Sequence, residues 1–118
     1  MAEATSWLFI IASGPYRHDL DSDPAIDIVM AAGAFGQQTM VLFMGDGLGY
    51  LDTKISAPDG HSDLRKLLKS LPLYEVETVH VVAEEESALP ASLSIPVEAI
   101  DTGRVSELFA RADHVVTF

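Results

Sequence analysis

The chain has 118 residues, which is enough to bury a hydrophobic core without disulfides or metal ions, and we predict a single domain over residues 1–118. It contains no cysteine, which excludes thiolate catalysis, persulfide chemistry and thiolate-bound zinc within this chain. Seven Lys and Arg against 18 Asp and Glu give a formal net charge of −11, which argues against direct binding to RNA or DNA because such binding depends on cations.

The first apolar segment is Trp7–Ala12, which is continuously apolar, as expected for a strand buried on both faces. It is shorter than the apolar region of a signal peptide, which has about 7–15 residues, and it follows the acidic Glu3. The chain has no apolar run of the ~18 residues that a membrane span needs. We therefore expect a cytoplasmic protein with no membrane span.

A helix and a strand are predicted next. Asp23 can cap the helix, Pro24 suits its first turn and Gly36 can end it. The apolar face of this helix consists of Ile26, Val29, Met30 and Ala34. Thr39–Met44 is then predicted as a second buried strand.

A second helix follows, capped by Ser62 and ended by Pro72, and its apolar stripe consists of Leu64, Leu67, Leu68 and Leu71. A third strand is predicted over Glu75–Val82, and Glu84–Leu89 forms a short acidic helix or turn.

The last third of the chain begins with a short fourth strand over Pro96–Ile100. Asp101 or Thr102 caps a final helix, and a fifth strand is predicted over His114–Phe118. The side chains of this helix expected to point inward are Val105, Leu108 and Phe109.

Alternating strands and helices predict the α/β class, with a mostly parallel five-stranded sheet in a single three-layer α/β/α domain of flavodoxin-like architecture. The patterns do not determine the strand order. Functional loops in such sheets lie at the carboxyl ends of the strands, here residues 13–19, 45–52 and 83–87.

The most distinctive of these loops reads MGDGLGY, residues 44–50. A phosphate-binding loop would need a lysine and a hydroxyl residue after the glycines, and a dinucleotide fingerprint would need a different spacing after the first strand. A response-regulator receiver would need an acidic cluster after the first strand and a lysine near the fifth, and both are missing. Gly45, Gly47 and Gly49 instead permit a tight turn in which Asp46 bonds to nearby backbone, and a partner could approach that backbone closely.

No catalytic set, metal site or cofactor site is predicted. The histidines are not spaced like metal ligands on one helix, and His80 and His114 are most simply structural. An alternative function is an enzyme or small-ligand binder that uses the crevice at the strand ends, with Arg17, His18 and Asp46 as its polar groups.

Several segments in order resemble the DsrE/DsrF-like sulfur-relay family, in its TusC/DsrF branch. Asp46, Gly47, Leu48 and Leu51 are similar to a D-G-(Val/Leu)-x-x-Leu motif of that branch. The other segments that carry the resemblance are ASGPY, AAGAFGQQ, LPLYEVETVHV and IDTGRVSELFARADHVVTF. Together they cover nearly the whole chain.

The resemblance implies a subunit of a heteromeric complex with TusD/DsrE-like and TusB/DsrH-like partners. The TusD/DsrE-like subunit carries the persulfide, and sulfur passes to a TusE/DsrC-like acceptor, toward 2-thiouridine in tRNA or in sulfur oxidation. The family's reactive cysteine matches Val81 or Val82 here, and neither can form a persulfide. The resemblance therefore implies a non-catalytic accessory subunit.

Within that interpretation, the expected interface loop comprises Asp46, Gly47, Leu48 and Tyr50. A family member that forms homo-oligomers, with no heteromeric partner, is the further alternative.

Overall fold

The computed structural model describes residues 5–16, 24–55, 57–58, 64–76, 79–82 and 92–118. In these ranges the strands are β1 (Ser6–Ile11), β2 (Gln38–Met44), β3 (Val79–Val82), β4 (Glu98–Ala99) and β5 (His114–Thr117). The helices are α1 (Pro24–Ala34), α2 (Leu64–Lys69) and α3 (Thr102–Arg111), and two 3₁₀ helices are η1 (Gly45–Leu51) and η2 (Leu71–Tyr74).

The five strands form one sheet in the order β4-β3-β2-β1-β5, and all four pairings are parallel. The predicted α/β class with a parallel five-stranded sheet is confirmed. β1 lies between β2 and β5, with Phe9 in register with Val41 on one side and with Val116 on the other. The two edges of the sheet are β4 and β5.

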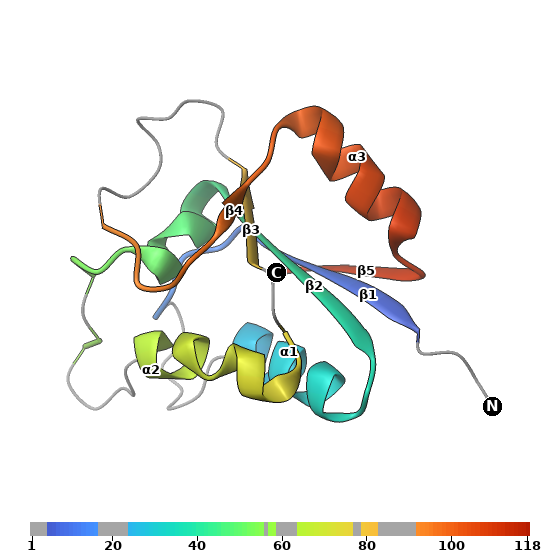
Figure 1. Cartoon of the computed structure of the whole chain (residues 1–118). Coiled ribbons are helices and arrows are strands. Elements are labelled where there is room, and N and C mark those ends of the chain that lie inside the picture. The colour runs from blue at the N-terminus through green and yellow to red at the C-terminus, as the bar shows by residue number, and fades with distance from the viewer. Residues whose placement is uncertain (1–4, 17–23, 56, 59–63, 77–78, 83–91) are drawn as a thin grey trace.

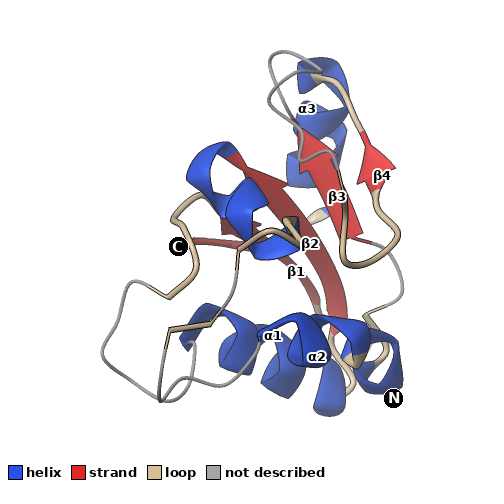
Figure 2. Ribbon diagram, turned by 90° about the vertical axis from the view of Figure 1, so that its left-hand side faces the viewer, coloured by secondary structure: helices blue, strands red, loops and turns tan. Residues whose placement is uncertain are grey.

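Helices cover both faces of this sheet, with α1 and α2 on one face and α3 on the other (Figures 1 and 2). Side chains of β1 alternate between the two faces, because successive residues of a strand point to opposite sides. Phe9 and Ile11 pack in the cluster shared with α1, whereas Leu8 and Ile10 pack in the cluster shared with Leu108 of α3. This two-sided burial explains why the segment is apolar throughout.

Helix α1 begins at Pro24 and ends at Ala34, and the predicted glycine Gly36 forms its C-terminal cap. Gly36 has a positive φ of 78°, and the N–H groups of Gly36 and Gln37 donate to the carbonyls of Gly33 and Ala32 at 3.0 and 3.1 Å. These two bonds make a Schellman motif, in which glycine avoids the steric penalty of left-handed backbone. The predicted cap Asp23 lies outside the described residues.

The inward face of α1 differs from the prediction at one position. Ile26 and Val29 are buried and Met30 packs against them, but Ala34 is exposed and Gly33 is buried in its place. Gly33 is buried because α1 crosses η2 there so closely that a Cβ on Gly33 would collide with the carbonyl oxygen of Tyr74.

The leucine helix is shorter than predicted, because α2 ends at Lys69 and Leu71 and Pro72 belong to η2. Leu64, Leu68 and Leu71 are still buried. The predicted cap Ser62 and the acidic segment Glu84–Leu89 lie outside the described residues.

The third strand does not begin at Glu75, as the sequence pattern predicted. Glu75 has a φ of 65°, and its N–H donates to the Pro72 carbonyl at 3.1 Å, so it ends η2. The first described residue of the strand is Val79, and the fourth strand likewise contains only Glu98 and Ala99.

Helix α3 is capped as expected by Asp101, whose carboxylate accepts a hydrogen bond from the Arg104 N–H at 2.9 Å. Leu108 is buried and Val105 is partly buried, but Phe109 is 45% exposed, so its predicted inward orientation is wrong. Within the described residues, no helix combines the length and apolar character needed to cross a membrane.

We predict that Gly33→Ala destabilises the protein by about 1–3 kcal/mol, because the new methyl group would force α1 away from the Tyr74 carbonyl. Ala34→Ser, at the exposed neighbouring position, is the control and should change stability by less than about 0.5 kcal/mol. Urea unfolding followed by circular dichroism measures both. Equal stability of the two variants would contradict the close crossing.

Candidate functional site

The glycine-rich segment forms η1, which lies against the carboxyl end of β1. A Cβ on Gly47 would collide with the carbonyl oxygen of Ile11, and Gly45 adopts a positive φ of 54°. A Cβ on Gly49 would lie 3.0 Å from Cδ of Pro15. The glycines therefore allow the turn to pack directly on the β1 backbone and on the loop that follows it.

Most of the expected interface loop is buried within this chain. Gly47, Leu48 and Tyr50 are buried, and the Tyr50 ring packs 5.5 Å from that of Phe43. Asp46 alone of the four expected interface residues is exposed. Any partner that meets this loop would meet Asp46 and the backbone around it, while Leu48 and Tyr50 hold the turn in the core.

Hydrogen bonds connect this turn to neighbouring segments at the carboxyl edge of the sheet. The backbone of Leu51 accepts from Ser94 N–H at 2.8 Å, and Thr53 N–H donates to the Ser92 carbonyl at 3.2 Å. The Arg65 guanidinium of α2 donates to the Thr53 carbonyl at 3.1 Å. The described part of this edge is therefore a connected, ordered surface.

Tyr16 connects the loop after β1 to the start of α2. Its phenolic oxygen accepts a hydrogen bond from the Leu64 N–H at 3.1 Å, and its φ of 58° turns the chain sharply. The free N–H groups at a helix start need such acceptors. The other polar groups of the alternative ligand site, Arg17 and His18, lie outside the described residues, so the structure does not show them beside Asp46.

Val81 and Val82 are both buried, at 0% and 7% exposure. Val81 packs in the cluster under α1 and α2, and Val82 packs in the cluster under α3. These two positions at the end of β3 supply apolar core and no nucleophile.

A second candidate region, which sequence reasoning missed, is a groove of about 630 Å³ between α3 and the sheet. Its polar wall includes Ser6 and Gln38 at the starts of β1 and β2, His80 of β3, and Arg104 and Arg111 of α3. Grooves of this size can hold a small ligand.

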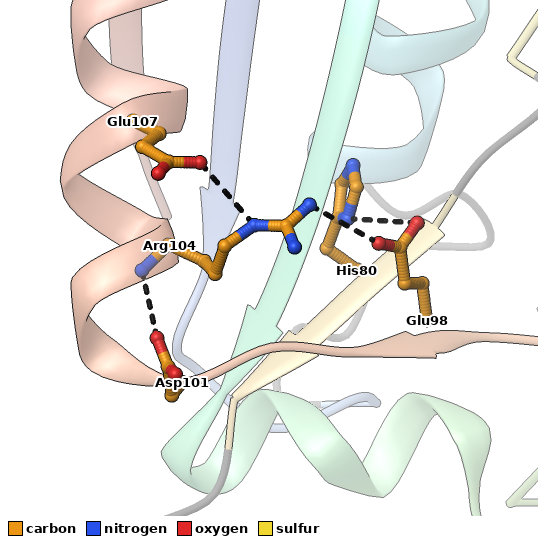
Figure 3. Close-up of polar contacts among 5 residues, drawn as sticks. All are labelled: His80, Glu98, Asp101, Arg104 and Glu107. Carbon is orange, nitrogen blue, oxygen red and sulfur yellow. Dashed lines mark hydrogen bonds and ion pairs between the residues drawn. The ribbon is translucent and has the colours of Figure 1, made fainter.

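A row of polar and charged side chains lines this groove: Glu107, Arg104, Glu98 and His80 (Figure 3). Arg104 lies between Glu107 and Glu98, with Nε 3.3 Å from Glu107 Oε2 and Nη2 3.6 Å from Glu98 Oε1. The other oxygen of Glu98 lies 3.8 Å from Nδ1 of His80. The row couples the edge strand β4 to α3.

His80 is the least exposed member of the row, since only 12% of its side chain is accessible. Burial lowers the pKa of His80 below 6.5, the nearby Glu98 opposes this shift, and Arg111 and Arg104 add to it. The lowered pKa favours the neutral form of His80 at pH 7, and its Nδ1 has no hydrogen-bond partner among the described residues. The sequence placed His80 in a strand but could not place Glu98 beside it, because that contact depends on the β3–β4 register.

Among the described residues, no three His, Asp or Glu side chains are grouped in a way that could hold a metal ion. His80, in the groove, faces carboxylates and arginines, and the groove wall contributes no thiol. This arrangement pairs Arg104 with Glu98 and Glu107.

Comparisons with known proteins identify the family of this chain and related structures. Residues 6–118 match the DsrE/DsrF-like family. The chain belongs to this family. It is 32% identical to a TusC homologue of Pseudomonas aeruginosa over 114 residues, covering 89% of this chain and 87% of that protein.

A second relative is the intracellular sulfur oxidation protein DsrF of Allochromatium vinosum. It is 30% identical over 115 residues, which cover 80% of this chain and 82% of that protein. The crystal structure of the ychN protein from E. coli has the same fold, with a TM-score of 0.75 over 97% of this chain and 99% of that chain, at 17% identity. The resemblance found in the sequence is thus confirmed, and so is the fold.

We predict that His80→Gln makes stability less sensitive to acid. A histidine whose pKa is lower in the folded state destabilises the fold as the pH falls below 6.5, because the unfolded chain binds the proton first. Between about pH 7 and about pH 5, wild type should therefore lose more unfolding free energy than the variant.

Urea unfolding at the two pH values measures this difference. His114→Gln, which removes an exposed histidine, is the control for the loss of an imidazole. An identical pH dependence in wild type and His80→Gln would contradict the prediction.

Proposed function

We propose that this chain is a cytoplasmic, non-catalytic subunit of a sulfur-relay complex of the TusBCD/DsrEFH type. The observation that carries the proposal is the absence of any cysteine from a DsrE/DsrF-like chain whose relatives are a TusC homologue and DsrF. A persulfide needs a cysteine sulfur, so the sulfur must be carried by another subunit. This chain would support that subunit's site.

The end of β3 supports an accessory role. Val81 and Val82 match the place of the reactive cysteine in cysteine-bearing relatives, and both are buried in this chain's own core. In this proposal, the two valines contribute core packing at these positions and carry no sulfur. In this proposal a TusD/DsrE-like partner holds the persulfide, a TusB/DsrH-like subunit completes the complex, and a TusE/DsrC-like protein accepts the sulfur, toward tRNA 2-thiouridine or in sulfur oxidation.

The glycine turn is the contact surface that we propose for this assembly. It is ordered by its close packing on Ile11 and by the bonds from Leu51 and Thr53 to the segment at Ser92–Ser94. A loop that is already ordered loses little conformational entropy on binding. Asp46 stands exposed on it, where it can bond to a partner's N–H groups or cations.

A second candidate function is a small-ligand-binding domain. The observation in its favour is the 630 Å³ groove under α3, where the buried Nδ1 of His80 has no hydrogen-bond partner in the described part of the chain. A metabolite that raises the melting temperature of wild type but not of His80→Ala would support this function over an accessory role.

We predict that Asp46→Lys weakens association with the TusD/DsrE-like and TusB/DsrH-like subunits of the same organism at least tenfold, because it reverses the exposed charge at the centre of the proposed contact. Asp27→Lys, which reverses an exposed charge on α1, is the matched control and should assemble normally. Size exclusion with light scattering on the co-expressed subunits measures the complex.

Asp46 is a better test position than Gly47. A valine at Gly47 would collide with the β1 backbone and so disturb folding and assembly together. Normal assembly of Asp46→Lys would refute the contact surface. A wild-type chain that ignores both subunits would refute the relay function itself.

A further inference from the structure

One cation of the groove under α3 is not balanced by a neighbouring carboxylate. Both glutamates that line the groove, Glu98 and Glu107, contact the same cation, Arg104, at 3.6 and 3.3 Å (Figure 3). Arg111, in the last turn of α3, lines the same groove, and its guanidinium forms no ion pair or hydrogen bond with the part of the chain that the structure describes. An unpaired guanidinium on the wall of a cavity can bind an oxyanion through two parallel N–H bonds.

A second hydrogen-bond donor on this wall comes from the start of β2. The Ser6 hydroxyl donates to Oε1 of Gln38 at 2.8 Å, so the nitrogen of the Gln38 amide is the end that remains to donate. That nitrogen has no hydrogen-bond partner among the described residues. Ser6 and Gln38 are in register, and both line the groove together with Arg111. This part of the wall therefore offers N–H donors that lack acceptors.

His80 supplies the third group. Its Nδ1 is buried, has no hydrogen-bond partner in the described part of the chain, and lies 3.8 Å from Glu98, which is too far for a hydrogen bond. Because buried polar atoms are nearly always hydrogen-bonded, such an atom on a groove wall points to a ligand.

Arg111 lies within electrostatic reach of this imidazole. Burial lowers the pKa of His80 most, Glu98 opposes the shift, and Arg111 adds to the lowering ahead of Arg104. The unpaired guanidinium and the buried imidazole therefore face the same part of the groove, where each disfavours positive charge on the other.

We propose that the groove binds a small oxyanion, a carboxylate or a phosphate, between the Arg111 guanidinium, the Gln38 amide nitrogen and His80. The anion balances the charge of Arg111 and accepts a hydrogen bond from the imidazole. Met40 and Leu108 give the same groove an apolar part that can hold the remainder of an organic anion. This inference rests on the small-ligand function named above as the second candidate, gives that function a ligand class, and does not depend on the relay complex.

Binding of the anion is coupled to protonation of His80. The charged groups that face His80 are Glu98 of β4 and Arg104 and Arg111 of α3, and Glu107 contacts Arg104. A further negative charge nearby favours the imidazolium, so the bound anion raises the pKa of His80. Because such coupling is reciprocal, the anion binds more tightly as the pH falls toward the pKa of His80.

The test is NMR titration of the isotope-labelled full chain with two probes, acetate and inorganic phosphate, at about pH 6 and about pH 8. Comparison with His80→Gln assigns the His80 signal. The signal of His114, which stacks on Trp7 on the opposite face of the sheet, is the internal reference. Arg111→Gln removes the unpaired cation, and Lys66→Gln, which removes an exposed cation on α2, is its matched control. Circular dichroism checks that both variants are folded.

We expect at least one probe to shift the His80 signal and to raise the pKa of His80 while His114 stays unchanged, with tighter binding at the lower pH. Arg111→Gln should raise the dissociation constant at least tenfold, and Lys66→Gln should bind as wild type does. Binding of acetate alone would identify a carboxylate ligand, and binding of phosphate alone a phosphate ligand.

Two results would overturn the proposal. One is an unchanged His80 signal at the highest concentration of both probes. The other is an Arg111→Gln variant that binds as tightly as wild type.

Co-expression with the relay subunits separates this inference from the relay function. A chain that binds neither probe but assembles with those subunits would refute the anion site and leave the relay function intact. A chain that binds a probe at Arg111 and His80 but ignores the subunits would refute the relay function alone.

Discussion

The structure depends on the burial of β1 from every side. Its strand neighbours are β2 and β5, Phe9 and Ile11 fill one core cluster, and Leu8 and Ile10 fill the other. Even its carboxyl end is covered, because η1 lies on the Ile11 carbonyl where only a glycine fits. The most distinctive motif of the sequence is thus first a packing device, and the exposure of Asp46 follows from that packing.

This arrangement separates the core of the protein from its contact surfaces. Val81 and Val82 at the end of β3 belong to that core, which agrees with the supporting role that we propose. What remains outside is an ordered turn with one exposed carboxylate, and a groove in which Arg104 is paired but Arg111 has no carboxylate partner among the described residues. The turn is suited to assembly and the groove to a small ligand.

The groove under α3 shows how one residue can combine structure and sensitivity to pH. Arg104 joins α3 to the edge strand through Glu98, and Asp101 starts the same helix by capping its backbone. His80 is the least exposed member of this row, buried enough that its charged form is disfavoured. The cost of burying an imidazole there is tolerated near neutral pH, where it carries no charge.

The sequence by itself determined the class of the fold, the order of its elements and the family, because continuous apolar runs, caps and turn residues are local properties. The strand at Trp7–Ala12, the helix start at Pro24 and the caps at Gly36 and Asp101 were predicted correctly for this reason. Tertiary structure decided what depends on distant contacts: the strand order, the outward turn of Phe109, the burial of Gly33 against Tyr74, and the meeting of His80 with Glu98. It also decided that Leu48 and Tyr50 belong to the core and Asp46 to the surface. Their burial depends on which segments of backbone lie against the turn, and the pattern of residues along the chain does not show those contacts.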